Sequence, residues 1–261
     1  MKVRKARRAM EKAIADPWAE SRNLQVRHAE NRNNFTAAIR SVQSHAMELV
    51  RDDDQRVRVE DYVAVLAAAT GEAALVDSGC IDIEHTELIP GQGIFGEAIN
   101  RVLSGDRTEL ADPDPMTVIG ILRGHLVPEV LPDEAFGSIL RLYEHVAESV
   151  GASPWGSVVV SVPEVHRPRI LPLRSAFDMR PLINEEAERL GFRSGPTGEG
   201  QPVAWSRHGL CAGALAAAIS QTATTLDPEL VTTLALDVTF GMAKMVPMSV
   251  AAFDSSSGES R

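Results

Sequence analysis

The sequence is poor in cysteine and in aromatic residues. Its 261 residues include two cysteines, Cys80 and Cys211. This excludes a disulfide framework and any zinc or thioredoxin-type site built on a CxxC motif. Aromatic residues make up only 5% of the chain, so the core must consist mainly of Ala, Val, Leu and Ile. A chain of this length buries enough apolar surface to fold without covalent cross-links or a structural metal.

The chain also lacks a long uninterrupted apolar run. A membrane-spanning helix needs roughly 18 or more apolar residues, and the best candidate, 230–246, is interrupted by Asp237 and Lys244. The basic first residues are not followed by the apolar segment of about 7–15 residues that a secretory signal requires. With its unpaired cysteines, this pattern predicts a cytoplasmic protein that does not contact a membrane.

Positive charge is scarce over most of the chain. The formal net charge is −10, which argues against general nucleic-acid binding, because that function favours a basic surface. Residues 1–12 carry six basic side chains against Glu11, a net charge of +5. Lys244 is the only lysine after this segment. We therefore expect the basic segment to contact an acidic protein partner, if any, rather than a nucleic acid.

Helical patterns dominate, and short apolar runs interrupt them. The spacing of apolar residues and the caps predict helices at 18–51, 59–78, 97–103, 132–150, 207–226 and 228–246. Strands are predicted at 81–89 and 157–162, while 116–122 fits either a strand or a helix. We expect an α+β fold that is predominantly helical, with a small sheet of two to four strands. The expected organisation is a basic segment and long polar helix (1–52), a main domain (53–253) and a disordered tail (254–261).

A glycine-rich loop offers one motif for nucleotide binding. Gly91, Gly93 and Gly96 match GxGxxG between a predicted strand and a predicted helix. The acidic partner expected about 20 residues later falls at Asp112 or Asp114, in a polar linker rather than at a strand end. A tight loop that needs glycine for its backbone geometry explains the motif better. A nucleotide-binding enzyme therefore stays as a second alternative.

The segment 81–89 and the helix before it carry candidates for acid–base chemistry. In a strand, His85 and Glu87 share one face with three isoleucines, and a carboxylate beside an imidazole suits a general base. Glu72 is the sole charged residue between Asp61 and Asp77, and burial would suit it to a general acid. A solvated hairpin and an exposed helix stripe are the alternatives. No metal-ligand spacing such as HExxH occurs, so we expect no metal and no other cofactor.

The last predicted helix and the one before it add further candidates. Asp237 and Lys244 are seven residues apart and share a helix face, where Lys244 could serve as a proton donor, an anion clamp or a nucleophile. A narrow solvent-exposed stripe is the alternative. Cys211 lies one turn from His208, but its small neighbours favour a packed core cysteine over a reactive Cys–His pair.

The segment 163–181 concentrates arginine. Its prolines at 163, 168, 172 and 181 argue against a long helix. Arginine forks suit carboxylate, phosphate or sulfate groups, so the segment predicts an anion-binding site. The alternative is that these side chains pair with the protein's own surplus acids. The candidate binding residues are His166, Arg167, Arg169, Arg174 and Arg180.

Together these residues favour a cofactor-independent small-molecule enzyme. We expect an acid–base lyase or cyclase whose substrate carries a sulfate, phosphate or carboxylate group, because arginines would stabilise the charge that develops on a leaving anion. The alternative is a non-catalytic partner subunit or adaptor, with arginines at the interface with an acidic protein or with a second copy of the chain. Convergence of the candidates on one pocket would favour the enzyme, and dispersal would favour the adaptor.

Overall fold

The structure is a computed structural model. It describes residues 19–83, 89–105, 114–127, 129–140, 158–192 and 206–249, with the side chains of the first helix from residue 30 onward. The chain divides into two compact units, Met1–Ala38 and Ile39–Arg261. Helix α2 (Ala19–Leu49) begins in the first unit and ends in the second. Everything that follows concerns the second unit.

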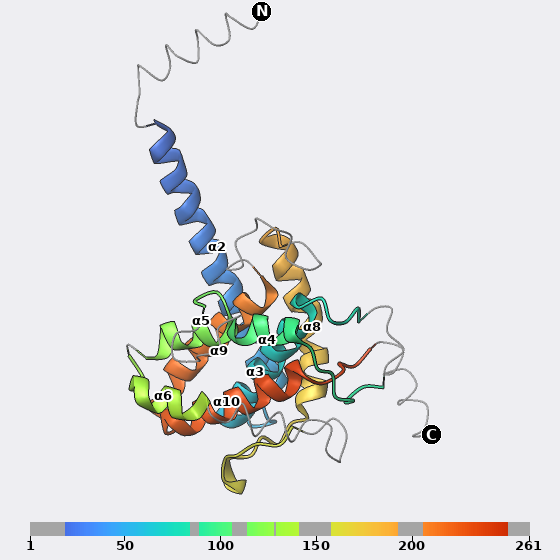
Figure 1. Ribbon diagram of the computed structural model, residues 1–261. Coiled ribbons are helices and arrows are strands. Elements are labelled where there is room, and N and C mark those ends of the chain that lie inside the picture. The colour runs from blue at the N-terminus through green and yellow to red at the C-terminus, as the bar shows by residue number, and fades with distance from the viewer. Residues whose placement is uncertain are drawn as a thin grey trace, which may run out of the picture. The chain divides into compact units, whose positions relative to one another are not determined.

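One helix forms the centre of this unit. Helix α3 (Val59–Asp77) is buried at every residue from Glu60 to Leu75, as its apolar composition on all sides requires. It contacts helices on several sides (Figure 1). These neighbours are α4 (Glu97–Ser104), α8 (Pro172–Arg189), α9 (Arg207–Thr222) and α10 (Pro228–Ala243).

The remaining elements are short. Helix α5 (Val118–Leu126) packs on α9, α6 (Asp133–Leu140) packs on α10, and η1 (Glu164–His166) is a single 3-10 turn. At the end of α2, the Gln43 side chain donates a hydrogen bond to the Ala214 carbonyl of α9 at 3.1 Å. Helix α10 begins at Asp227–Pro228, where the aspartate accepts from the Glu229 and Leu230 amides. This confirms the cap-and-proline start that the sequence predicts.

Helices α3 and α10 cross in near backbone contact at Gly71. A Cβ atom at this glycine would lie 2.3 Å from the Thr239 carbonyl oxygen and 2.9 Å from the Ala243 amide nitrogen. The Thr239 hydroxyl donates to the Ala67 carbonyl at 3.2 Å.

The predicted α+β fold is wrong. The described residues contain helices and no strand or sheet, only isolated bridges at Arg51–Val57 and Gly93–Met245. Residues 118–122 of the segment 116–122 begin α5, and 81–83 form no strand. Of the predicted strand 157–162, the described part is extended but pairs with side chains. The Ser161 amide donates to Asp237 at 2.6 Å, which replaces the partner that a neighbouring strand would supply.

The prolines also proved a poor guide to one helix. Helix α8 contains Pro172 and Pro181, although they argued against a long helix there. Pro172 lies in the first turn, where no amide is needed, and Pro181 lies at an exposed position inside the helix. Burial of Ala176, Met179 and Ile183 at helical spacing offsets the lost hydrogen bond, which costs about 3 kcal/mol.

Within the described residues, no helix has the length and apolarity that crossing a membrane requires.

Candidate functional site

Four carboxylates on α3 organise the polar groups of this unit. Glu60 and Asp61 lie in its first turn, Glu72 lies in its last third and Asp77 is its final residue. All four are at most 9% exposed, and an ionised carboxylate so placed needs partners. The described structure supplies each of them with partners from other parts of the chain. The four carboxylates therefore define three polar clusters, one at each end of α3 and one between.

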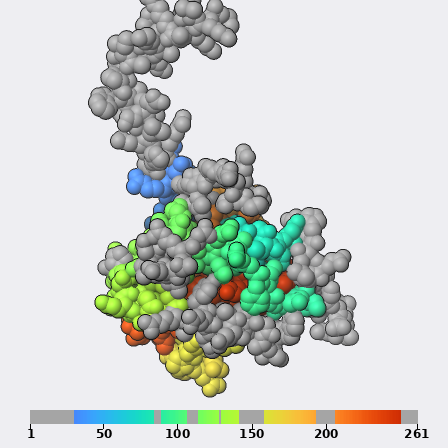
Figure 2. All heavy atoms as spheres, in the orientation of Figure 1, coloured from blue at the N-terminus to red at the C-terminus, as the bar shows by residue number. Residues whose placement is uncertain are grey.

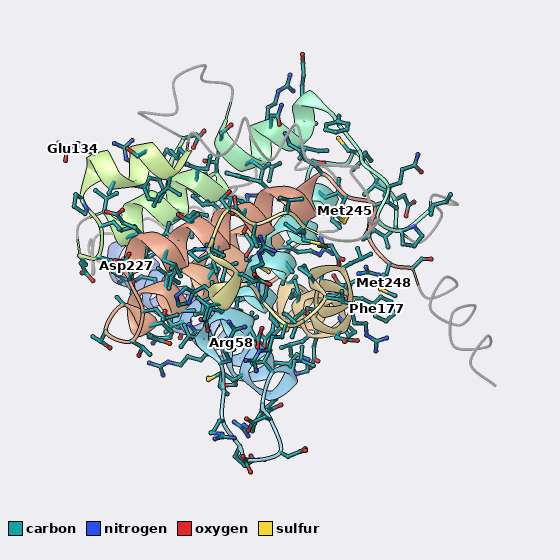
Figure 3. All side chains as sticks on the ribbon, turned by 90° about the horizontal axis from the view of Figure 1, so that it is seen from below. Arg58, Glu134, Phe177, Asp227, Met245 and Met248 are labelled. Atoms are coloured by element: carbon teal, nitrogen blue, oxygen red, sulfur yellow. The ribbon has the colours of Figure 1, made fainter. Side chains whose placement is uncertain are left out.

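The N-terminal cluster begins with Arg58, which caps the start of α3 (labelled in Figure 3). Its Nε lies 3.3 Å from Glu60 Oε2, and its Nη1 lies 3.5 Å from Asp61 Oδ1. The same guanidinium donates to the Val165 carbonyl at 2.6 Å and to the Arg167 carbonyl at 2.7 Å. Arg58 thus joins α3 to a segment more than 100 residues away in the chain.

Two more contacts hold that segment, residues 163–171, which we call the proline segment. His166 Nδ1 lies 2.8 Å from Glu60 Oε1, and the Arg169 amide donates to Asp61 Oδ1 at 2.6 Å. Burial alone would raise the pKa of Glu60, but the hydrogen bond from His166 and the charge of Arg58 outweigh it and lower that pKa. The ionised Glu60 carboxylate therefore holds His166, and Asp61 accepts a hydrogen bond from the backbone of the proline segment.

The proline segment presents large side chains to solvent while its backbone is held. Val165 is 72% exposed and Leu171 is 66% exposed, and the side chains of Arg167 and Arg169 are exposed beside them in the chain. The segment leaves the helical body, turns at η1 and returns to the start of α8 (Figure 1). Its surface stands out at the edge of the molecule in yellow (Figure 2). The arginines predicted to grip an anion thus include two that face outward.

The middle cluster joins Glu72, predicted from the sequence to be a general acid, to Arg180, predicted to bind an anion. Arg180 on α8 grips Glu72 with both nitrogens of its fork, at 2.6 and 3.0 Å, and donates to the Met248 carbonyl at 2.6 Å. Its guanidinium also lies 5.2 Å from the centre of the Phe177 ring. Phe177 and Met248 are labelled side by side in Figure 3. Glu72, the predicted general acid, is therefore one half of a bidentate ion pair.

Arg174, the other predicted anion-binding arginine on α8, contacts a carboxylate of its own helix. Arg174 Nε lies 2.8 Å from Asp178 Oδ2, one turn further along α8, and its side chain is 44% exposed. Its guanidinium lies 5.7 Å from the Phe177 ring. Of the five predicted anion-binding residues, His166, Arg174 and Arg180 thus contact the protein's own carboxylates through their side chains. This is the arrangement expected of the alternative in which the arginines pair internally.

Asp237 on α10 and Lys244, which directly follows that helix, are buried. Asp237 accepts from the Ser161 amide, and the Ser161 hydroxyl lies 3.5 Å from its second oxygen. Lys244 is only 6% exposed, and burial lowers its pKa. These positions differ from the exposed stripe considered for this helix. The other two catalytic candidates, His85 and Glu87, lie outside the described residues, so their predicted roles stay predictions.

The glycine loop packs along the segment that follows α10. The Gly91 amide donates to the Val246 carbonyl at 2.8 Å, and the Ile94 amide donates to the Lys244 carbonyl at 2.8 Å. Gly91 has φ +86°, a conformation that favours glycine. Because these two amides already bind protein carbonyls, they do not point at a phosphate as those of a dinucleotide loop do. The geometry supports the tight-loop explanation of this motif.

The C-terminal cluster was not predicted. Asp77 Oδ2 lies 2.8 Å from His208 Nδ1 and accepts from the His208 amide at 2.9 Å, while Arg207 Nη1 lies 3.6 Å from Asp77 Oδ1. On the far side of the ring, His208 Nε2 lies 3.2 Å from the Ser206 hydroxyl. The sequence signal was a serine cap two residues before a histidine, but nothing in the sequence joined either residue to Asp77.

The thiol of Cys211 is buried in the core. Burial raises the pKa of the Cys211 thiol, and the charges of Asp77 and Glu72 raise it further, so the thiol is a core group as predicted rather than a reactive thiolate. Within the described ranges, no group of three or more His, Cys, Asp or Glu side chains is arranged to hold a metal ion.

No family model, no curated protein and no solved structure matches the chain.

Proposed function

We propose that the protein is a partner subunit or adaptor that binds another protein through the proline segment, residues 163–171. The observation that carries the proposal is the contrast within this segment. Its backbone and His166 are held by Arg58, Glu60 and Asp61, whereas the side chains of Val165 and Leu171 face solvent. A segment fixed in this way exposes Val165 and Leu171 in one arrangement.

Such an arrangement favours binding for an energetic reason. A flexible loop loses conformational freedom when it binds, at a cost of about 0.5–1.5 kcal/mol for each side chain that becomes ordered, and a segment already held loses less. Exposed valine and leucine side chains then provide apolar area for a partner to bury. The proline segment therefore has the properties of a preformed docking element.

The exposed arginines define the chemistry of the partner. Arg167 and Arg169 lie between Val165 and Leu171 in the chain and are exposed. Arginine is enriched at protein interfaces. A partner surface that combines an apolar patch with carboxylates would match them in charge. The proposed partner is the acidic cytoplasmic protein that the sequence led us to expect. Its carboxylates would contact the two exposed arginines. The acid–base lyase and its anionic substrate stay predictions, with His85 and Glu87 at their centre.

Site-specific photo-crosslinking tests the proposal in cells. A benzophenone amino acid would be placed at position 165 or 171, and, as matched controls, at the exposed helical positions Glu134 and Glu229. We expect one protein product to cross-link at 165 and at 171 and at neither control. That product would be purified and titrated against the wild type, Val165→Asp, Arg167→Glu and Glu134→Arg.

The affinities of the variants for the purified product then test whether the proline segment is the binding site. Val165→Asp should weaken binding by tenfold or more, because it places a charge in an apolar contact, and Arg167→Glu should weaken it most at low salt. Glu134→Arg should bind like the wild type. Equal cross-linking at the test and control positions, or equal affinity of Val165→Asp and the wild type, would contradict the proposal.

A further inference from the structure

The C-terminal cluster has the order of contacts of a serine nucleophile, its base and the group that orients the base. The chain of contacts runs from Asp77 Oδ2 to His208 Nδ1 at 2.8 Å, and from His208 Nε2 to Ser206 Oγ at 3.2 Å. Asp77 is the last residue of α3, while Ser206 and His208 open α9. Three side chains from two elements thus meet in the same sequence of atoms that activates serine in acyl-transfer enzymes.

The other contacts of the cluster indicate which atoms of His208 and Ser206 donate and which accept. Asp77 Oδ2 also accepts from the His208 amide at 2.9 Å, so this oxygen acts as an acceptor and Nδ1 carries a proton toward it. In the neutral ring, Nε2 is then the acceptor. The Ser206 oxygen already accepts from the Gly209 amide at 3.1 Å, which leaves its own proton for Nε2. Ser206 is therefore held with its hydroxyl as donor to an oriented imidazole.

Two features stabilise the charges that would form when the proton moves. The Met116 carbonyl lies 3.4 Å from His208 Nε2, where a protonated ring would find an acceptor. Ser206 is the N-cap of α9, a helix of 16 residues, and the positive end of its dipole favours negative charge on the serine oxygen. Asp77 faces the ring from the other side. The cluster thus suits a transient pair of imidazolium and alkoxide.

Other buried serines show what a purely structural hydroxyl does. Ser104 donates to the Asn100 carbonyl at 3.1 Å and Ser175 donates to the Leu171 carbonyl at 3.1 Å, both within their own helices. They are 8% and 7% exposed, close to the 6% of Ser206. Both hydroxyls donate to a backbone carbonyl rather than to an imidazole. The three serines are similarly buried, and among them Ser206, the N-cap of α9, is the one whose hydroxyl lies beside a base.

We propose that Ser206 is a nucleophile toward carboxylic esters with a small acyl group, with His208 as its base and Asp77 as the positioning residue. Ser206 Oγ attacks the ester carbonyl carbon while its proton passes to His208 Nε2. The tetrahedral adduct expels the alcohol oxygen, which takes that proton, and the acyl group stays on Ser206. Water then attacks the acyl carbon and gives a proton to the same nitrogen. The acyl bond to Ser206 Oγ breaks, Oγ takes that proton back, and the carboxylic acid leaves. The low exposure of Ser206 is the reason to expect a small acyl group.

Phosphorylation of serine by an organophosphate tests this centre in the full-length protein without a known substrate. The probe is diisopropyl fluorophosphate, read by intact mass and by mapping the modified peptide. We expect one adduct on Ser206 of the wild type, none on Ser206→Ala, and an unchanged rate for Ser104→Ala and Ser175→Ala. His208→Gln should slow labelling by about 10²–10⁴-fold. Thermal unfolding would show which variants are folded, and Asp77→Asn, which keeps the side-chain shape, provides a second test of the relay.

Labelling of the wild-type protein, compared with that of the variants, distinguishes a nucleophilic serine from a helix cap. Absence of an adduct on Ser206, or labelling of Ser206 at the same rate in folded His208→Gln or Asp77→Asn, would show that the cluster is only a helix cap. Labelling of Ser175 as fast as Ser206 would do the same. A stable Ser206 adduct whose rate depends on His208 and Asp77 would establish the nucleophile, whatever the outcome for the proline segment.

Discussion

The two ends of α3 carry the same pair of groups in different surroundings. At each end a carboxylate lies 2.8 Å from a histidine Nδ1, Glu60 with His166 and Asp77 with His208. The side chain of His166 is 26% exposed, whereas that of His208 is 1% exposed. The pair with the partly exposed histidine fixes a segment that faces solvent, and the pair with the buried histidine orients an imidazole against a serine. Equal contact distances therefore lead to different roles, and burial makes the difference.

Burial should also separate the two pairs energetically. Breaking a buried ion pair by removing one partner costs about 3–5 kcal/mol, because the other partner is left without compensation in a low dielectric. Pairs near the surface contribute about 0–1 kcal/mol, because water screens them and replaces a lost partner. Glu72 and Arg180, whose side chains are 5% and 17% exposed, lie between these limits. The three clusters of α3 thus form a series that mutations can test.

The largest loss is expected for Asp77→Ala. This change leaves the His208 amide, the His208 ring and Arg207 without their shared acceptor, and should lower the free energy of unfolding by about 3–5 kcal/mol. Urea denaturation followed by circular dichroism would measure it. The same change at the other end, Glu60→Ala, is the matched control and should cost far less. Equal losses at both ends would show that burial does not separate the two pairs.

An intermediate loss is expected for Glu72→Gln. The amide keeps the size of the side chain but removes the charge that accepts both Arg180 nitrogens, so we expect a loss of about 1.5–3 kcal/mol. Arg180→Met and the double variant would complete a thermodynamic cycle. A coupling energy near zero would mean that Glu72 and Arg180 do not act as a pair, and would restore Glu72 as an independent candidate for acid–base chemistry.

The smallest loss is expected from titration of Glu60. Its pKa lies below the ordinary value of 4.5 in the folded protein, so the ionised form stabilises the fold. This stabilisation should be complete above pH 4.5 and should disappear as the pH falls through the lowered pKa. Relative to Glu60→Gln, the wild type should gain about 1 kcal/mol or less at pH 7 and nothing at the acidic limit. Denaturation curves at several pH values would show this, and a constant difference would contradict it.

The sequence predicted the helices better than their surroundings. Apolar residues on all sides of 59–78 indicated a buried helix, and the Asp227–Pro228 start was visible because caps and prolines act locally. The strand predicted at 157–162 failed because its amides depend on distant partners, such as Asp237 for Ser161. An extended apolar run does not reveal whether a strand or a buried carboxylate will accept its hydrogen bonds.

The candidate site divides in the same way. Composition singled out Glu72 and the arginines of 163–181 as residues that need explanation, and they do take part in specific contacts. Their pairing was not visible, because Glu72 and Arg180 are 108 residues apart and only the packing of α8 on α3 joins them. The contact of Asp77 with His208 spans 131 residues. Local patterns predict which residues are unusual, whereas the fold decides which of them meet.

Hydrogen exchange at the Arg169 amide tests most directly whether α3 holds the proline segment. This amide donates to Asp61 Oδ1 at 2.6 Å, so it should exchange at least about tenfold more slowly than an unprotected amide in the wild type. Asp61→Ala should remove that protection while amides within α3 stay protected. Exchange of the wild-type Arg169 amide at the unprotected rate would contradict the account, because the segment would then have no fixed conformation to offer a partner.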